Sequence, residues 1–256
     1  MNIAVCIKQV VTRDWPLRAD DGATWVRDHD ASFEMNEPDA YALEEGLRLK
    51  ERHGGEVVVC SAGPTRVGQV IREALARGAD RAVHVESAAL AAADAGAVSG
   101  ALAAAMRSEA FDLVLTGLQS DDQGFGQTGV VLAELLGLPH ATLIMEVEAA
   151  GEQTGQIRVK RELEGGWFQW VSMPTPALLT IQSGINQLRY ATLKGIMAAK
   201  KKEVRTVTLD VPPAVGHRIL EIYTPGKGKQ TRLVDGAPAD AAAELVRLLR
   251  EEARAL

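Results

Sequence analysis

The sequence lacks the residue patterns that mark several large classes of enzyme. Its two cysteines, Cys6 and Cys60, lie in separate apolar runs, so we predict neither a disulfide framework nor a CxxC metal site. The five histidines are scattered singly and no H-E-x-x-H motif occurs, so no metal centre is expected. The G-x-x-x-x-G-K-[ST] motif of P-loop hydrolases and the G-x-S-x-G elbow of serine hydrolases are also missing.

The chain also has no excess of basic residues and no long apolar run. Its 28 lysines and arginines stand against 34 aspartates and glutamates, a formal net charge of -6, so we expect no nucleic-acid partner. No run is long enough to span a membrane, and the chain begins with the strand-like run 2–11 instead of a basic leader and an apolar signal segment. We therefore expect a cytoplasmic protein that is not embedded in a membrane.

What the sequence does contain is a regular alternation of strand and helix patterns. This alternation predicts an α/β fold with a doubly wound, mostly parallel, Rossmann-like sheet. The 256 residues are enough for one large core. The apolar runs of strand length lie at 2–11, 55–62, 81–85 and 113–116, and the helical patterns at 37–50, 65–77, 94–108 and 127–136.

The second half of the chain departs from this alternation. Short strand-like runs separated by turns predict a small antiparallel meander, followed by one more apolar strand. An amphipathic pattern near the C-terminus predicts a final helix. The predicted strands lie at 140–149, 156–163, 167–172 and 177–181, the turns at 151–155 and 164–166, and the helix at 239–255.

The segment between the strand at 113–116 and the next helix is rich in glycine. Glycines let backbone N–H groups turn toward a ligand. Gln127, Thr128 and Gly129 would open the helix, where unpaired N–H groups and the helix dipole attract a phosphate. These features predict the phosphate site of a mononucleotide.

Two alternatives remain for the same segment. Gly124, Gly126 and Gly129 spell the dinucleotide fingerprint G-x-G-x-x-G, and an acidic residue follows about 20 residues later. That fingerprint normally follows its strand directly, whereas here residues 118–123 intervene. The other alternative is a glycine-rich surface loop that binds no ligand.

Asn36 stands at a second turn where a ligand could bind. It precedes the helical pattern at 37–50, with Pro38 in the first turn, and is a typical helix cap. The same turn lies between the first strand and the first helix, at the carboxyl edge of the sheet, where ligands bind in open α/β folds. Cys60, at the end of the next strand, is interpreted as a small core residue rather than a nucleophile.

Longer motifs connect the chain to a known family. Val159–Thr180, VKRELEGGWFQWVSMPTPALLT, has a basic residue, an acidic residue and a glycine-rich turn, then a strand and a proline before an apolar run. Arg189–Lys202, RYATLKGIMAAKKK, comes shortly after it. Over residues 1–210 the chain resembles the β subunit of electron transfer flavoproteins. Shorter segments that share the resemblance are 36–39, 61–64, 78–80 and 127–129.

The resemblance implies that the sheet is of the adenine nucleotide α-hydrolase-like type. It also implies a heterodimer whose α subunit holds most of the FAD site, while the β subunit buries an AMP that takes no part in the chemistry. Electrons would pass from acyl-CoA dehydrogenase-type flavoproteins through the FAD to a membrane quinone oxidoreductase. The AMP contacts implied for this chain are Cys6, Asn36, Glu37, Pro38, Asp39, Ala62, Gly117, Leu118, Gln119, Ser120, Asp121, Asp122, Gln123, Gly124, Phe125, Gly126, Gln127, Thr128 and Gly129.

Some members of the family hold a second FAD in place of AMP and bifurcate electrons. Their loop tends to contain D-x-T-A-Q-V-G, whereas this chain has GFGQTG at 124–129, so we favour AMP. The AMP-type loop usually has Asn at the position of Gly126 and another acidic residue near Gln123. The contacts with the base or the ribose are therefore expected to differ in this chain.

The segment 188–202 matches the recognition loop of the family. Leu193 corresponds to the leucine that the family inserts into an apolar pocket of the dehydrogenase, and one exposed apolar anchor suits a quickly reversible contact. Without the resemblance, Leu193 would be interpreted as the start of a core-facing helix. Lys200, Lys201 and Lys202 would be interpreted as solvated surface charges rather than as charges that dock a partner. Lys194-Gly195 replaces the common Pro-Asn, so a more flexible loop and a different partner are expected. The resemblance assigns partner binding to Arg189, Tyr190, Leu193, Ile196, Met197, Lys200, Lys201 and Lys202.

These patterns divide the chain into a nucleotide-binding domain at 1–187, a recognition segment at 188–202 and a C-terminal arm and helix at 203–256. The arm would pack on the α subunit, and a helix packed on its own chain is the alternative. We expect an electron-carrier subunit without catalytic residues of its own. The alternatives from other classes are an NAD-linked or adenylating α/β enzyme and a stress-type AMP- or ATP-binding protein.

Overall fold

The computed structural model describes residues 1–149, 155–209, 215–226 and 231–255, so most of the turn predicted at 151–155 lies outside the described residues. The chain divides into two compact units, Met1–Ile222 and Tyr223–Leu256. These units are defined by the packing of the chain. The division into a nucleotide-binding domain, a recognition segment and a C-terminal arm is a division by role and stays a prediction.

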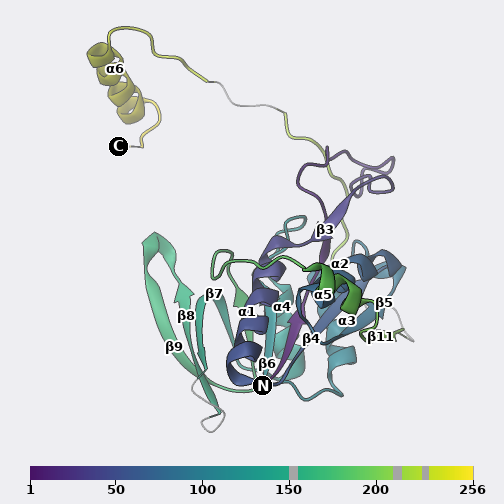
Figure 1. The fold of residues 1–256 in the computed structure, drawn as a ribbon. Coiled ribbons are helices and arrows are strands. Elements are labelled where there is room, and N and C mark those ends of the chain that lie inside the picture. Colours follow the sequence, from purple (N-terminus) through teal and green to yellow (C-terminus); the bar gives the residue numbers. More distant parts are fainter. Residues whose placement is uncertain (150–154, 210–214, 227–230, 256) are drawn as a thin grey trace. The chain divides into compact units, whose positions relative to one another are not determined.

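In its described residues the first unit forms a sheet of nine strands, in the order β11-β5-β4-β1-β6-β10-β7-β8-β9 (Figure 1). The strands from β11 to β7 run parallel to their neighbours, while β7, β8 and β9 form an antiparallel meander. The predicted doubly wound, mostly parallel sheet is confirmed. The bounds are β1 Asn2–Cys6, β4 Glu56–Gly63, β5 Arg81–Glu86, β6 Leu113–Gly117, β7 His140–Ala149, β8 Gln156–Glu162, β9 Phe168–Pro174, β10 Ala177–Ile181 and β11 Val204–Val207; a separate pair contains β2 Gln9–Val11 and β3 Phe33–Met35.

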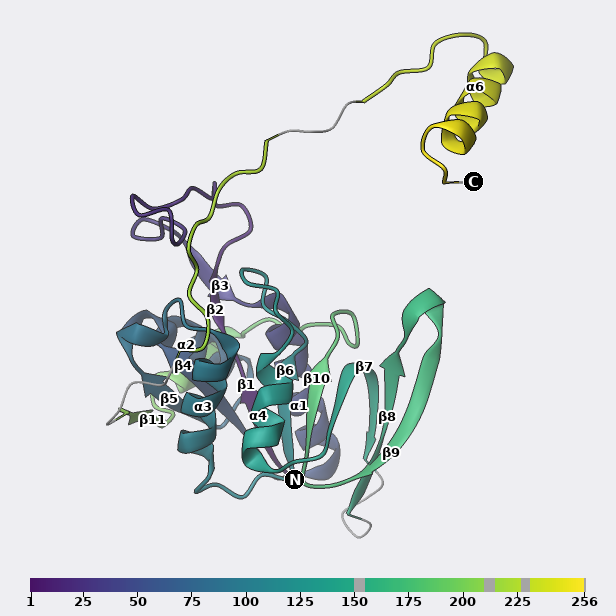
Figure 2. The ribbon, with the colours of Figure 1, turned by 180° about the vertical axis from the view of Figure 1, so that it is seen from behind.

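Helices cover both faces of the parallel part of the large sheet, and successive residues of its strands point to these opposite faces. On one face, Ile3 and Val5 share a core with α1 and α2. On the other face, Ala4 and Cys6 share a core with Leu102 of α3 and with α4 (Figure 2). The bounds are α1 Glu37–His53, α2 Gly68–Arg77, α3 Ala95–Met106, α4 Thr128–Leu136 and α5 Leu193–Ala199, with 3-10 turns η1 Thr65–Val67, η2 Ala88–Leu90 and η3 Glu164–Gly166.

The run predicted as one strand at 2–11 is two strands in the structure. β1 ends at Cys6, and β2 pairs antiparallel with β3 in the separate two-stranded sheet. The backbone N–H of Lys8 donates to the carboxylate of Asp39, 2.7 Å away, instead of to a neighbouring strand. The prediction of one continuous strand was wrong, because apolar composition does not show that a distant side chain will accept the hydrogen bond of a backbone N–H group.

The second unit contains α6, Pro238–Glu251, which overlaps the helix predicted at 239–255 and ends four residues earlier. Its Leu245 and Val246 are exposed, so the helix has apolar side chains that its own unit does not cover. Among the helices of the described residues, none is both long and apolar enough to cross a membrane.

Candidate functional site

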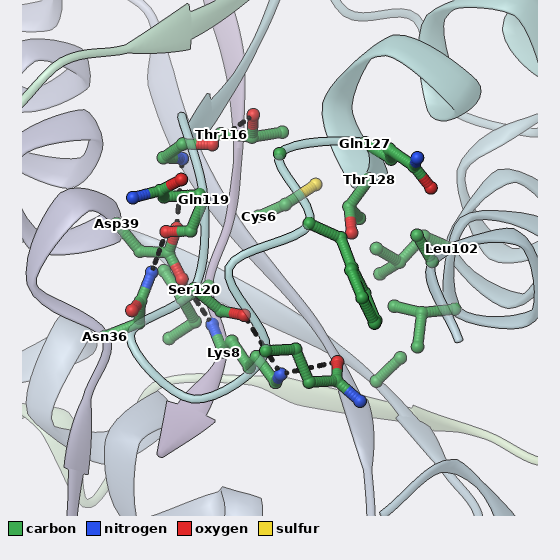
Figure 3. Close-up of a pocket in the computed structure, with 18 of the residues that line it drawn as sticks. Cys6, Lys8, Asn36, Asp39, Leu102, Thr116, Gln119, Ser120, Gln127 and Thr128 are labelled. Carbon is green, nitrogen blue, oxygen red and sulfur yellow. Dashed lines mark hydrogen bonds between the residues drawn. The ribbon is translucent and has the colours of Figure 1, made fainter. Parts of the chain in front are cut away.

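A cavity lies at the carboxyl ends of β1 and β6, beside the start of α4 (Figure 3). This is the edge at which open α/β sheets bind ligands. The fold brings to it most of the residues predicted for a nucleotide site, although they are distant in the sequence. The predicted residues that line the cavity are Cys6, Asn36, Asp39, Ala62, Gly117, Leu118, Gln119, Ser120, Gln123, Phe125, Gly126, Gln127 and Thr128.

Asp39 joins the segments that form the cavity. One of its carboxylate oxygens accepts the backbone N–H of Lys8 at 2.7 Å, and the other accepts that of Gly117 at 2.9 Å (Figure 3). Burial raises the pKa of Asp39 to about 7, although these two hydrogen bonds act in the opposite direction. The carboxylate therefore ties the ends of β1 and β6 to the first turn of α1.

Asn36 holds the glycine-rich loop rather than capping α1. It occupies the N-cap position, but its side chain makes no capping hydrogen bond. Its Nδ2 donates to the carbonyl of Gln119 at 3.0 Å, and its Oδ1 accepts the N–H of Asp121 at 2.9 Å. The predicted cap is right in position and wrong in its hydrogen bond, because the loop offers the amide both a donor and an acceptor.

Lys8 also belongs to the site, although it was not predicted from the sequence. Its ammonium donates to Asp122 at 2.6 Å, to Gln123 at 3.1 Å and to Ser120 at 3.3 Å, and the residue lines the cavity (Figure 3). Lys8 and Asn36 thus hold consecutive parts of the same loop. A single lysine that interrupts an apolar run at the carboxyl end of the first strand is the signal that could have identified it.

Close contacts explain two glycines of the site. A Cβ atom on Gly117 would lie 2.3 Å from the carboxylate Oδ1 of Asp39, and one on Gly129 would lie 2.6 Å from Oγ1 of Thr116. A larger residue at either position would displace β6 or α4. Gly124 has space around it, but its φ of +65° lies in the left-handed region that favours glycine.

The first turn of α4 supplies hydrogen-bond donors for an anion. Within the part of the chain that the structure describes, the backbone N–H groups of Gln127, Thr128 and Gly129 have no protein acceptor. Gln127 and Thr128 line the cavity. Unpaired N–H groups at a helix N-terminus, together with the helix dipole, favour a phosphate or carboxylate.

Apolar side chains complete the cavity. They come mainly from η2, from α3 and from the segment between them. They were not predicted from the sequence, because small and branched apolar residues at helical spacing have the same pattern as core residues. The lining residues that it did not predict are Ile7, Lys8, Leu90, Ala91, Ala93, Ala95, Val98, Leu102 and Thr116.

Some predicted site residues stand behind the cavity rather than in its wall. Asp121 pairs with Arg13 at 3.4 Å and accepts the N–H of Glu37, so both acidic residues support the loop from outside. Gly129 packs against Thr116 on the sheet side of α4. The predicted residues that do not line the cavity are Glu37, Pro38, Asp121, Asp122, Gly124 and Gly129.

The predicted partner-binding residues lie on α5 and the segments next to it, and none of them lines the cavity. Tyr190 is 90% exposed, Leu193 78%, Met197 58% and Ile196 45%, so α5 presents apolar side chains to solvent. Lys200 and Lys201 are also exposed. This arrangement differs from a core-facing helix that begins at Leu193.

Arg189 and Lys202 point toward the protein instead. Arg189 pairs with Glu44 at 2.7 Å and with Glu51 at 2.6 Å, on α1. The ammonium of Lys202 donates to the backbone carbonyls of Leu75 and Ala79, at the end of α2. These two basic side chains are thus engaged within the chain, unlike their predicted neighbours.

The two thiols are poor nucleophiles. Burial raises the pKa of Cys6 well above its usual range and raises the pKa of Cys60 to about 12, so both remain protonated near neutral pH. The described residues also contain no group of three or more His, Cys, Asp or Glu side chains placed to bind a metal ion.

Comparison with known proteins connects this cavity with a family. Residues 24–212 match a family model described as the electron transfer flavoprotein domain. The chain is 37% identical to the electron transfer flavoprotein subunit beta of Methylophilus methylotrophus, over 98% of each chain. It is 34% identical to that of Bacillus subtilis and 37% identical to the mitochondrial subunit beta of Oryza sativa subsp. japonica, over 100% of each chain. The chain therefore belongs to the family of electron transfer flavoprotein β subunits, as its motifs predict.

Proposed function

We propose that this chain is the β subunit of a heterodimeric electron transfer flavoprotein, that it binds a structural AMP, and that it helps to hold an FAD-bearing α subunit. The observation that carries the AMP assignment is the combination of unpaired N–H groups at Gln127–Gly129 with apolar lining from α3. The N–H groups suit the phosphate, and the apolar side chains suit the adenine base. The loop held by Asn36 and Lys8 would close around the nucleotide.

The chemistry available in the cavity supports a bound nucleotide that does not react. Both oxygens of Asp39 accept backbone N–H groups, so this carboxylate is engaged in holding the fold. The thiol of Cys6 has a raised pKa and is not a nucleophile near neutral pH. The flavin of the α subunit would supply the redox chemistry, and this chain's residues would bind and position.

We assign the exposed apolar side chains of α5 to the docking of electron donors. A small apolar surface with exposed lysines beside it favours contacts that form quickly and separate quickly. The donors would be acyl-CoA dehydrogenase-type flavoproteins, the acceptor a membrane quinone oxidoreductase, and the site of action the cytoplasm.

One observation favours a second candidate, a bifurcating flavoprotein with a second FAD in place of AMP. A neighbouring cavity, lined by residues that include Trp25 and Phe33, shares Ala91, Gln123 and Phe125 with the first. A ligand longer than AMP could extend from one cavity into the other. We favour AMP because GFGQTG at 124–129 differs from the loop of the bifurcating members.

The test is to purify the chain under native conditions with whatever accompanies it, and to identify the released ligands by absorbance and mass. One AMP and one FAD per heterodimer would support the proposal. Two FAD molecules would identify the bifurcating type. A monomer that carries NAD, or that carries no nucleotide and has no partner, would contradict both assignments.

A further inference from the structure

The short helix α5 and the longer helix α2 hold each other through their C-terminal ends. Arg72 of α2 donates from Nη1 to the carbonyl of Ala199 at 2.7 Å and to that of Lys202 at 3.0 Å. In return, the ammonium of Lys202 donates to the carbonyls of Leu75, at 3.0 Å, and Ala79. Each helix end therefore receives a cation from the other segment, which satisfies carbonyls that lack a helical partner.

The backbones of the two helices also approach closely. A Cβ atom on Gly195 would lie 2.2 Å from the carbonyl oxygen of Ala76, so only glycine fits at this contact. Thr192 caps α5 by accepting the N–H of Gly195 at 3.0 Å, and Ala199 is buried. One side of α5 is therefore fixed on α2.

The other side of α5 faces solvent with Leu193, Ile196 and Met197. A helix of 7 residues is too short to be stable by itself in water. The geometry of these exposed side chains consequently depends on the contacts with α2.

We infer that Arg72 and Lys202 are positioning residues for partner docking, because they lock α5 on α2 and so hold Leu193 and its apolar neighbours in one arrangement. This inference rests on the proposed function of α5 as the docking surface. It separates the three consecutive lysines by role. Lys200 and Lys201 are exposed and can attract an acidic partner, whereas Lys202 acts through α5.

The surroundings of Lys202 agree with this role. Desolvation by burial lowers the pKa of its ammonium, while the Asp80 carboxylate acts in the opposite direction. A cation that is partly removed from water and hydrogen-bonded to carbonyls holds a structure, whereas a steering charge must remain in water.

Preorganisation determines which kinetic constant should change. If α5 is loosened, the partner must order it during binding, and affinity falls by that ordering cost. The complex that finally forms has the same geometry, so electron transfer within it keeps its rate. Loss of Lys202 should therefore raise KM and leave kcat unchanged.

The experiment compares Lys202→Met with Lys201→Met in the full heterodimer. Hydrogen–deuterium exchange of the amides of 193–199 is measured without any dehydrogenase. We expect exchange about tenfold faster in K202M and unchanged in K201M, because only the first variant frees the helix. Arg72→Gln, which removes the reciprocal contact, should behave like K202M and serves if K202M does not assemble.

The second readout is steady-state reduction of the heterodimer by a medium-chain acyl-CoA dehydrogenase with octanoyl-CoA, at low and high salt. K202M should raise KM about fivefold at both salt concentrations, and K201M should raise it only at low salt. Unchanged exchange in K202M, or a KM effect of K202M that disappears at high salt, would overturn the inference. If the wild-type heterodimer accepts no electrons from this dehydrogenase, the assigned donor is wrong, while the exchange comparison still decides whether Lys202 holds α5.

Discussion

Asp39 provides the sharpest test of how the site is built. Its buried carboxylate accepts the backbone N–H groups of Lys8 and Gly117, and burial raises its pKa from 3.8 to about 7. The substitution Asp39→Asn keeps the size of the side chain and one acceptor oxygen, but it removes the group that titrates. The wild type and D39N should therefore differ in how their stability depends on pH.

The sign and size of this difference follow from the raised pKa. Between pH 3.8 and about 7 the folded state keeps the Asp39 proton and the unfolded state does not. The stability that the protonated Asp39 side chain contributes is thus fully present below pH 3.8, the pKa in the unfolded state. It is lost as the pH rises through about 7, the pKa in the folded state. Each pH unit in this window is worth about 1.4 kcal/mol, so between about pH 5 and about pH 7 the wild type should lose about 3 kcal/mol relative to D39N.

The assay is urea unfolding of the purified heterodimer, wild type and D39N, at several pH values from about 5 to about 8.5, with excess AMP throughout. Other ionisable groups contribute equally to both proteins and cancel in the difference. The free energy of unfolding of the wild type minus that of D39N should fall as the pH rises to about 7 and then stay constant. A difference that is the same at every pH, or that grows with pH, would refute the reasoning from burial.

Four further substitutions test other parts of the structure. Gly129→Ala should destabilise the protein by about 3 kcal/mol and reduce its nucleotide content, because the added Cβ meets Thr116 and Thr180. Gly124→Ala is the control: this position has space but a positive φ, so the variant should lose only about 1 kcal/mol. Equal losses of stability in urea unfolding would contradict this prediction. Asp94→Ala should lower the free energy of unfolding by about 3 kcal/mol and speed proteolysis at 215–222, because Asp94 caps α3 and accepts the N–H groups of Gly216 and His217. An unchanged cleavage rate would contradict this role of Asp94. Leu193→Ala should leave the free energy of unfolding within about 0.5 kcal/mol of the wild type and slow electron transfer from an acyl-CoA dehydrogenase about tenfold; unchanged transfer would remove the docking assignment.

The strands and helices could be predicted because burial on both faces leaves a clear mark in the sequence. Val57, Val58 and Val59 alternate between the two helical layers, yet all three are buried, so the strand appears as a continuous apolar run. Gly137 ends α4 in the left-handed conformation that glycine adopts easily. Local rules of this kind predict the fold class and most element positions.

The details of the site depend on contacts between distant residues, which no local rule contains. Asn36 and Gln119 are 83 positions apart, and Lys8 and Asp122 are 114 apart, so neither contact can be inferred from spacing. Leu102 of the cavity has the same helical spacing as core residues of α3. The glycines and the helix N-terminus were predictable because their chemistry is local.

The position of β10 constrains the order in which the protein can fold during synthesis. Within the sheet, β10 lies between β6 and β7, and β7 has β10 and β8 as its neighbours. As the chain leaves the ribosome, β7, β8 and β9 are made before the strand that connects them to the rest of the sheet. The meander therefore cannot join the rest of the sheet until residues 177–181 have been made and can pair with both β6 and β7. Until then the edge of the sheet at β6 has no neighbouring strand.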